Sequence, residues 1–385
     1  MLVACVSAQG QSSVTIYGLL DAAMTSAKTS NGTRLPGGGA VVSGSSVLRM
    51  DSGVGPGGSR LGFRGVEDLG GGLVARFVLE GGPAVDTGAY QQGGLPFGRQ
   101  VFVGLGSNKV WSVTAGRQYT PINNEFALSV PTYGFYWGNP LTNSGFGIYE
   151  SVAEAPGSGF FQATGRMDNS VLFDAYLGKF TANLMIAPGN ENPRKTGRYI
   201  NPAISYVDGP LAIRASYAQF KQGAASIAPG AQPEWLKQFV LGGSYNFGVV
   251  HAFAGVFGFN GPQNPANLSP AATVGSPTAN VFSYSWQKQR SAWVGARIPL
   301  GSGTLMTSVL RNKLDYATGP DGKSTSFLLA YEHPLSKRTL LYGSYGNMKN
   351  DAFTNTPLVA TVVAVPASGF GSDVRAMSLG VRHTF

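Results

Sequence analysis

The chain has 385 residues and a net charge of +9, with 43% hydrophobic residues, only 12% charged residues and 55 glycines. Average globular chains carry about 25% charged residues, and strands with one face toward lipid would explain the deficit. No segment reaches the roughly 18 consecutive apolar residues of a spanning helix, which excludes a helical membrane protein. The single cysteine, Cys5, excludes a disulfide framework.

Residues 1–10 are interpreted as the remainder of a secretory signal peptide. Ala8-Gln9-Gly10 supplies a small-residue cleavage site, and Gln11 is then the first residue of the mature chain. The stretch up to Cys5 also resembles a lipoprotein cleavage site, but no basic start and no full apolar core precede it, so a lipid anchor is the less favoured alternative. Residues 11–385 are predicted to form one domain.

The first predicted strand lies in the stretch VTIYGLLDAAM, and residues 25–58, rich in Gly, Ser and Asn, predict a long loop. Residues 59–80 predict a β-hairpin around the turn 67–72, because apolar and polar side chains alternate on both sides of it. Its polar face carries Arg60, Arg64, Arg76 and Glu80. A soluble sheet rarely places three arginines on one face, whereas a barrel with lipid outside and water inside does so naturally.

Short turns and long loops alternate along the rest of the chain. Seven short turns and eight long segments connect sixteen strands, with both termini on the side of the short turns. The longest segment covers about 119–165, and the segment at 347–373 includes an apolar stretch, Leu358 to Val365, that also suits a strand. The last strand ends on Phe385 and would close the sheet against the first. The pattern predicts an all-β fold, a 16-stranded antiparallel transmembrane β-barrel.

Charge and motif patterns exclude several classes of function. The arginines are spread singly along alternating strands, which argues against a nucleic-acid partner. The three histidines, His251, His333 and His383, have no recognisable serine and acid partners, and no metal-ligand spacing occurs. We therefore predict no catalytic residue, no metal and no cofactor, and keep an outer-membrane hydrolase only as a remote alternative.

Five stretches carry a family resemblance: VTIYGLLDAAM, SRLGFRGVEDLGGGLVARFVLEGG, RQVFVGL, AGRQYTP and the terminal VRHTF. Together they resemble the general diffusion porins of Gram-negative bacteria, in particular those of the beta-proteobacterial type, over essentially the whole of residues 11–385. The resemblance implies a homotrimer in the outer membrane, in contact with lipid and lipopolysaccharide. It also implies passive diffusion of small hydrophilic solutes and inorganic ions, and a third loop, about 119–165, that folds into the lumen.

In this family, arginines of the barrel wall face acidic residues across the narrowest part of the channel. Carried over by motif, the arginine of SRLGFRG is Arg60, that of RQVFVGL is Arg99, and that at the start of the strand after the third loop is Arg166. The glutamate of FVLEGG is Glu80. The resemblance implies that these four residues form the pore constriction. Each arginine could instead pair with barrel carbonyls or with Glu80.

The third loop departs from the family pattern. It is unusually long and aromatic, and its acidic residues are Glu125, Glu150 and Glu154, of which Glu125 is the first choice for the acid that faces the arginines. Aromatic rings can form a sliding track for sugars or aromatic acids, so a substrate-specific channel is the main alternative, although packing of the loop is the commoner use of such residues.

The other charges that the strand pattern places on the lumen face complete the prediction. They are Arg64, Arg76, Asp21, Asp168 and Arg214, together with Asp174, Lys179 and Arg297. Including the constriction residues, the excess is basic, and guanidinium stays protonated at any working pH. We therefore expect a preference for anions that weakens as salt approaches molar concentrations, where the screening length falls to about 3 Å.

Overall fold

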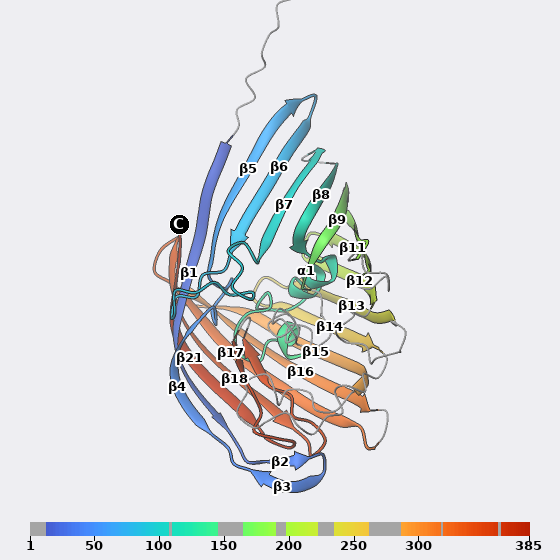
Figure 1. Cartoon of the computed structure of the whole chain (residues 1–385). Coiled ribbons are helices and arrows are strands. Elements are labelled where there is room, and N and C mark those ends of the chain that lie inside the picture. The colour runs from blue at the N-terminus through green and yellow to red at the C-terminus, as the bar shows by residue number, and fades with distance from the viewer. Residues whose placement is uncertain are drawn as a thin grey trace, which may run out of the picture.

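The computed structural model describes residues 13–107, 110–144, 165–189, 198–221, 235–261, 286–316, 319–360 and 363–385. The predicted signal remnant at 1–10 lies outside these residues, as do Glu150 and Glu154. The described part consists mainly of long antiparallel strands that slant around a ring (Figure 1). None of the helices in the described ranges is long and apolar enough to cross a membrane.

Neighbouring strands are hydrogen-bonded in antiparallel fashion around the whole ring. The strands of the ring are β1 (Ser13–Thr29), β4 (Ser46–Ser52), β5 (Arg60–Gly70), β6 (Leu73–Gly81), β7 (Gln100–Ser107), β8 (Trp111–Tyr119), β9 (Arg166–Leu177), β10 (Phe180–Ala187), β11 (Tyr199–Asp208), β12 (Leu211–Lys221), β13 (Trp235–Asn246), β14 (His251–Asn260), β15 (Trp286–Leu300), β16 (Gly303–Tyr316), β17 (Gly322–Pro334), β18 (Thr339–Asn350) and β21 (Val374–Thr384).

The ring closes at β1, which pairs with β21 along one edge and with β4 and β5 along the other. β5 pairs with the first half of β1 and β4 with the second half, so these two segments share one position in the ring. The seventeen strands of the sheet therefore occupy sixteen positions. The prediction of a closed 16-stranded antiparallel barrel is confirmed. Closure leaves no unpaired edge in the sheet.

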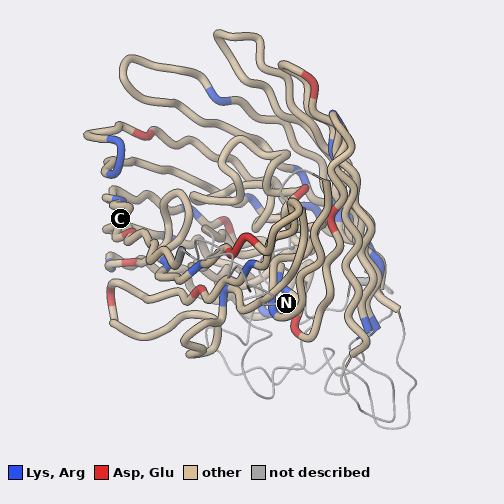
Figure 2. Tube along the Cα trace, turned by 90° about the horizontal axis from the view of Figure 1, so that it is seen from above, with Lys and Arg blue, Asp and Glu red and all other residues tan. Residues whose placement is uncertain are grey.

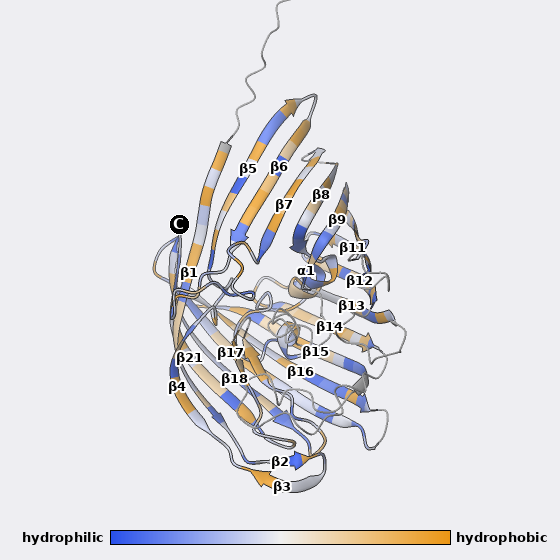
Figure 3. Cartoon of the chain, viewed as in Figure 1, coloured by the Kyte–Doolittle hydropathy of each residue, from blue (hydrophilic) through white to orange (hydrophobic). Residues whose placement is uncertain are grey.

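The two faces of the wall differ as the sequence alternation requires. Large apolar side chains project from one face, such as Val103, Val294 and Leu379, which are 62%, 61% and 72% exposed. Hydropathy alternates along the strands in the same way (Figure 3). Exposing apolar surface to water costs roughly 25 cal/mol per Å². An apolar face of this extent is therefore stable only in contact with hydrocarbon. It is the outer face of the barrel, and the opposite face lines the inside.

The predicted loop at 25–58 is wrong over much of its length. β1 continues to Thr29, β2 (Gly32–Leu35) and β3 (Gly38–Val42) form a small hairpin, and β4 lies in the barrel wall. Residues 46–52 have a weak strand pattern, so composition alone does not predict β4. The strand forms because it is hydrogen-bonded to β1. The apolar stretch at 358–365 also forms strands, β19 (Leu358–Ala360) and β20 (Val363–Val365), but these pair with each other and not with the barrel.

The segment from Thr120 to Ser144 lies against the inner face of the wall. It contains α1 (Pro121–Ala127), capped by Thr120, and α2 (Pro140–Asn143), capped by Asn139, and each helix begins with a proline. Figure 1 shows α1 in the middle of the ring of strands. Because 145–164 lies outside the described residues, the placement of the predicted third loop can be followed only over its first half.

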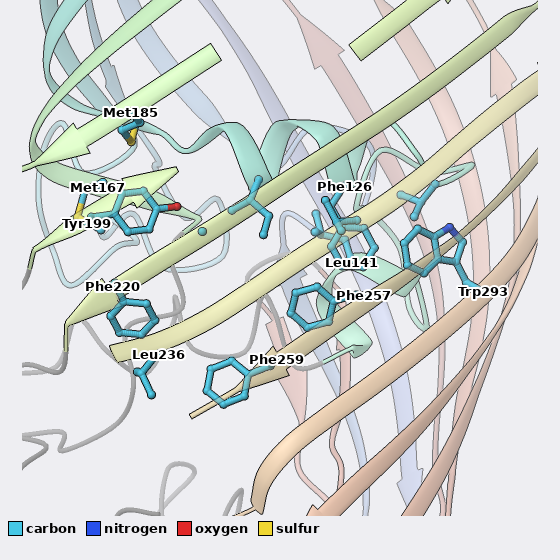
Figure 4. Packing of buried hydrophobic residues seen from close by; sticks show 14 of the residues in the cluster. Phe126, Leu141, Met167, Met185, Tyr199, Phe220, Leu236, Phe257, Phe259 and Trp293 are labelled. Carbon is cyan, nitrogen blue, oxygen red and sulfur yellow. The ribbon is translucent and has the colours of Figure 1, made fainter. Parts of the chain in front are cut away.

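Aromatic packing holds α1 against the wall. Phe126 is fully buried, and its ring lies 4.5 Å from the ring of Trp293 on β15, nearly stacked, and 5.4 Å from that of Phe257 on β14 (Figure 4). Burying a phenylalanine side chain contributes roughly 1.5–3 kcal/mol. The inner face of the wall is therefore not uniformly polar, since an apolar cluster anchors the helix there.

Glycines on the wall mark the path of the segment. A Cβ atom on Gly242 of β13 would lie 2.6 Å from the Cβ of Ser129, and one on Gly295 of β15 would lie 2.7 Å from the Cγ of Pro131. Real Cβ atoms essentially never come this close to other heavy atoms. The absence of side chains at these positions thus lets the segment lie directly on the strands.

Candidate pore constriction

Glu80, at the end of β6, is the centre of a buried polar cluster and is only 2% exposed. One carboxylate oxygen accepts a hydrogen bond from Nε of Arg99 at 2.7 Å, and the other accepts one from the hydroxyl of Tyr17 at 2.9 Å. Nη1 of Arg60 lies 3.8 Å from the same carboxylate. Two guanidinium groups and a phenol thus offset the free-energy cost of burying this charge.

The sheet register explains how Tyr17 reaches Glu80. Gly62 of β5 is the cross-strand partner of Tyr17 on one side and of Glu80 on the other. A Cβ atom on Gly62 would lie 2.5 Å from the Tyr17 ring. Because Gly62 has no side chain, the phenol passes over it and contacts the carboxylate two strands away.

Tyr119, the last residue of β8, brings the third arginine to the cluster. Nη2 of Arg99 and Nη2 of Arg166 each donate to the Tyr119 hydroxyl oxygen at 2.6 Å. The guanidinium carbon of Arg166 also lies 4.4 Å from the centre of the Tyr119 ring, a cation–π contact. Three guanidinium groups therefore surround one carboxylate and one phenol, and the cluster has an excess of positive charge.

The structure thus brings together Arg60, Arg99, Arg166 and Glu80, the four residues that the sequence motifs single out. Their exposure differs. Arg99 is 3% exposed and donates to Glu80 and Tyr119, whereas the side chain of Arg60 is 23% exposed and its guanidinium donates to the carbonyls of Gly57 and Gly58. No sequence pattern indicates the roles of Tyr17 and Tyr119, although both lie in the quoted motifs VTIYG and RQYTP.

Glu125 does not face this cluster, contrary to the sequence-based first choice. It lies in α1, and its carboxylate is 3.6 Å from Nε of Arg214 on β12, an ion pair too long for a hydrogen bond. Burial raises the pKa of Glu125 to about 7, and the nearby Arg214 limits this rise. Glu125 and Arg214 therefore form a separate, titratable pair between the inner segment and the wall.

Arg297 also holds the inner segment, residues 120–144, against the wall. Arg297 of β15 donates from Nε to the carbonyl of Pro131, and its guanidinium carbon lies 4.1 Å from the ring centre of Tyr133. Trp293, on the same strand, donates from Nε1 to the carbonyl of Ser129 at 3.0 Å. The predicted lumen charge Arg297 thus serves partly to hold the segment.

Two predicted lumen charges need correction. Asp21 is on the inner face but has no exposed surface, because residues 53–59 cover it, and its Oδ1 accepts hydrogen bonds from the backbone of Gly53 and Gly55 at 3.0 Å. Asp168 pairs at 2.7 Å with Arg117, whose cross-strand partner Val101 lies on the apolar outer face. A bulge in β9 near Asp168 shifts the alternation that placed it inside.

Of the remaining predicted lumen charges, Arg64 and Arg76 stay on the inner face, whereas Lys179 lies in the turn between β9 and β10 and pairs with Asp208 at 2.6 Å. Arg64 is exposed, and its guanidinium carbon lies 5.0 Å from the ring centre of Tyr17. Arg76 is half-buried and has Val66, two residues on from Arg64, as its cross-strand partner. Basic residues as a whole are spread around the barrel rather than gathered on one element (Figure 2). The cluster of Arg60, Arg99 and Arg166 is therefore a local concentration of positive charge, whereas the other basic residues are dispersed around the barrel.

A closed barrel with an apolar outer face, a charged inner face and a segment lying on that inner face defines a transmembrane channel protein. The comparisons agree. A family model described as Gram-negative porin matches residues 1–352. The chain belongs to this family, and it is a porin of the Gram-negative outer membrane.

Individual relatives support this assignment along the whole chain. An outer membrane porin protein of Bordetella pertussis is 30% identical, over 98% of this chain and 96% of the relative. Outer membrane porin protein 32 of Delftia acidovorans is 29% identical, over 100% of this chain and 97% of the relative. Among solved structures, the anion-selective porin from Comamonas acidovorans superimposes with a TM-score of 0.72 at 25% identity, over 97% of this chain and 100% of that one.

Proposed function

We propose that the cluster of Arg60, Arg99 and Arg166 around Glu80 is the constriction of the channel, and that it gives the pore a preference for anions. The observation that carries this proposal is the geometry of the cluster: three guanidinium groups share one carboxylate and one phenol. A fixed positive field at a narrow point lowers the energy of an anion that gives up part of its hydration shell. The description of the Comamonas relative as anion-selective is in line with this.

We also propose that the inner segment narrows the lumen beside the cluster and that small hydrophilic solutes and inorganic ions pass by diffusion. The contacts of α1 with the wall support this proposal, since they hold the segment against the inner face. Three of the five aromatic residues in the described part of the segment favour this role over a substrate-specific track, whereas Tyr133 is 41% exposed. Phe126, Tyr136 and Trp137 are fully buried in packing contacts, so their rings are not available to solutes.

The proposed assembly is a homotrimer without enzymatic activity. OmpT of Vibrio cholerae shares the fold at a TM-score of 0.62 and is described in a trimer form. The fold and family of this chain are those of a channel, and we assign no catalytic residue to it. The size of the particle in detergent, measured by light scattering, tests the trimer.

The test of the constriction is the reversal potential in a planar bilayer under a tenfold salt gradient. We expect the wild-type protein to be anion-selective and Arg60→Ala, Arg99→Ala and Arg166→Ala each to shift the potential toward cations. Arg311→Ala is the matched control, because Arg311 projects from the outer face and should leave the potential unchanged. An anion preference that survives all three substitutions would place the selectivity elsewhere.

A further inference from the structure

A second group of basic side chains lies on the inner face, on strands other than those of the constriction. Arg214 is in β12, His251 is the first residue of β14, and Arg297 is near the end of β15. His251 and Arg297 are cross-strand partners, so they share a face of the sheet. His251 also lies within electrostatic range of both arginines. The three residues therefore face the same part of the lumen.

This group is close to the short-turn end of the barrel. Each of its residues lies near one of the short turns, which occupy 209–210, 247–250 and 301–302. The arginines of the constriction lie instead at or next to the long-loop ends of β5, β7 and β9. Short turns of outer-membrane barrels are periplasmic. A solute that moves inward therefore passes the constriction first and this second group afterwards.

Arg297 has donors that no protein group uses. Its Nε donates to the carbonyl of Pro131, on the inner segment. In the described part of the chain, Nη1 and Nη2 have no hydrogen-bond partner, and they are not buried. These two nitrogens form one edge of the guanidinium group, which has the geometry to bind both oxygens of a carboxylate. Arg297 can therefore hold the inner segment and bind an anion at the same time.

Tyr133 places an aromatic ring beside these donors. The guanidinium carbon of Arg297 lies 4.1 Å from the centre of the ring. Tyr133 is 41% exposed, whereas Phe126, Tyr136 and Trp137 of the same segment are fully buried. Its backbone has a φ of +53°, which is uncommon for a residue with a large side chain. A strained backbone thus presents a single ring to the lumen, and strain of this kind is concentrated at functional sites.

The charge of the group is only partly compensated. Glu125 lies 3.6 Å from Nε of Arg214, and no other described carboxylate forms an ion pair with Arg214 or Arg297. Nε and Nη1 of Arg214 are buried and have no hydrogen-bond partner among the described residues. Two guanidinium groups against one carboxylate leave an excess of positive charge, which attracts anions.

We propose that Arg297, Arg214 and Tyr133 form a second anion site, which prefers aromatic carboxylates, on the periplasmic side of the constriction. The free edge of Arg297 binds the carboxylate, Arg214 adds to the positive field, and the ring of Tyr133 contacts the aromatic part of the solute. Chloride or acetate uses the charge alone and is held more weakly. The site rests on the water-filled lumen of the proposed function, but not on the assignment of the constriction.

The test is the block of the chloride current through the full-length protein in a planar bilayer. Benzoate, cyclohexanecarboxylate and acetate are added in turn to each side. Benzoate and cyclohexanecarboxylate have the same charge and a similar size, but only benzoate has an aromatic ring. We expect benzoate to block at concentrations about threefold to tenfold lower than cyclohexanecarboxylate, and acetate to block least.

Two substitutions of Tyr133 separate the ring from the fold of the segment. Tyr133→Phe keeps the ring and should keep the preference for benzoate over cyclohexanecarboxylate. Tyr133→Leu removes the ring and should abolish that preference. Both variants place a large side chain on the same left-handed backbone, so they share any effect of strain. Loss of the preference in both variants would overturn the role of the ring, as would equal block by the two acids in the wild-type protein.

Substitution of Arg297 tests the charge. Arg297→Gln should weaken block by benzoate and cyclohexanecarboxylate about tenfold. Arg64→Gln is the matched control, because Arg64 is also an arginine of the inner face beside a tyrosine ring, 5.0 Å from the centre of that of Tyr17. Equal weakening in the two variants would show a general effect of lumen charge and overturn the site.

The site and the constriction can fail separately. Calorimetric titration of benzoate into the protein in detergent detects the site without a current. The reversal potentials of Arg60→Ala, Arg99→Ala and Arg166→Ala test the constriction without benzoate. Unchanged potentials together with a benzoate preference that depends on Tyr133 would reject the constriction and support the second site. Shifted potentials without that preference would support the constriction and reject the second site.

Discussion

The hydroxyl oxygen of Tyr119 lies 2.6 Å from Nη2 of Arg166, whose guanidinium carbon is also 4.4 Å from the centre of the Tyr119 ring. Tyr119 therefore fixes the direction of Arg166 through both its hydroxyl group and its ring, and the same oxygen accepts a hydrogen bond from Arg99. Tyr119 thus positions two of the three arginines of the cluster.

The first prediction concerns Tyr119→Phe. This change removes the acceptor shared by Arg99 and Arg166 but keeps the ring, so two guanidinium donors lose a partner. We expect the protein to lose about 1–3 kcal/mol of stability and the anion preference to weaken as the arginines reorient. Thermal unfolding and the reversal potential measure the two effects. Tyr331→Phe is the control, because Tyr331 lies near the end of β17 and its hydroxyl donates a single exposed hydrogen bond to the carbonyl of Leu300. Identical behaviour of the two variants would argue against a positioning role for Tyr119.

The second prediction concerns Glu80→Gln. The change removes the carboxylate that compensates Arg60 and Arg99, so the cluster gains a full positive charge. We expect a stronger anion preference together with a stability loss of about 3 kcal/mol, because a buried ion pair is broken. The measurements are the reversal potential and the midpoint of denaturant unfolding. Glu67→Gln, in the exposed part of β5, is the control. A shift toward cation selectivity would contradict this prediction.

The barrel could be predicted because the alternation that identifies each strand is local in the sequence. A strand between lipid and water must alternate with a period of two residues, and Leu61 and Phe63, flanked by Arg60 and Arg64, show this directly. Arg60, Arg99, Arg166 and Glu80 could be placed from their motifs. Composition does not show that these four residues meet, because their meeting depends on strand pairing. The family motifs imply it, because the arrangement of these motifs in the barrel is known.

The remaining site residues depend on features that alternation does not encode. Asp168 lies at a bulge, and a single extra residue moves a side chain to the other face. Asp21 has the predicted orientation, but a segment more than thirty residues away in sequence covers it. Glu125 was assigned to the arginine cluster by its place in the third loop, and only the packing of α1 shows that it meets Arg214.

The third prediction is a dependence of selectivity on pH that originates at Glu125. Burial raises the pKa of Glu125 to about 7, well above the usual range of a glutamate carboxyl. Below pH 7 the carboxyl is protonated and leaves Arg214 uncompensated, so the anion preference should increase as pH falls from 8 to 6. For an acid with a raised pKa, the contribution to stability is fully present below the unfolded value and is lost as pH rises toward 7. Stability should therefore fall as pH rises from about 4.5 to about 7 and stay level above that.

Glu125→Gln isolates this effect, because glutamine keeps the shape of the protonated carboxyl at every pH. We expect the variant to show the selectivity of the acidic state throughout and a flat profile between pH 6 and 8. The reversal potential at fixed salt, measured at steps across this range, is the readout. Glu67→Gln should keep the wild-type profile. A variant profile as steep as that of the wild type would assign the titration to another group.

The fourth prediction concerns the contact between the inner segment and the hairpin of β19 and β20. The side-chain amide of Asn143 donates to the carbonyl of Val359 at 2.8 Å and accepts from its N–H at 3.0 Å, so it pairs with the backbone as a strand would. Asn143→Ala leaves the buried N–H of Val359 without this partner, which costs about 1–3 kcal/mol locally, while the Val359 carbonyl keeps longer hydrogen bonds from Thr142 and Gly138. We expect faster proteolysis within 351–373 and a noisier single-channel current. Asn246→Ala, at an exposed turn, is the control, and equal noise in both variants would mean that this contact does not steady the channel.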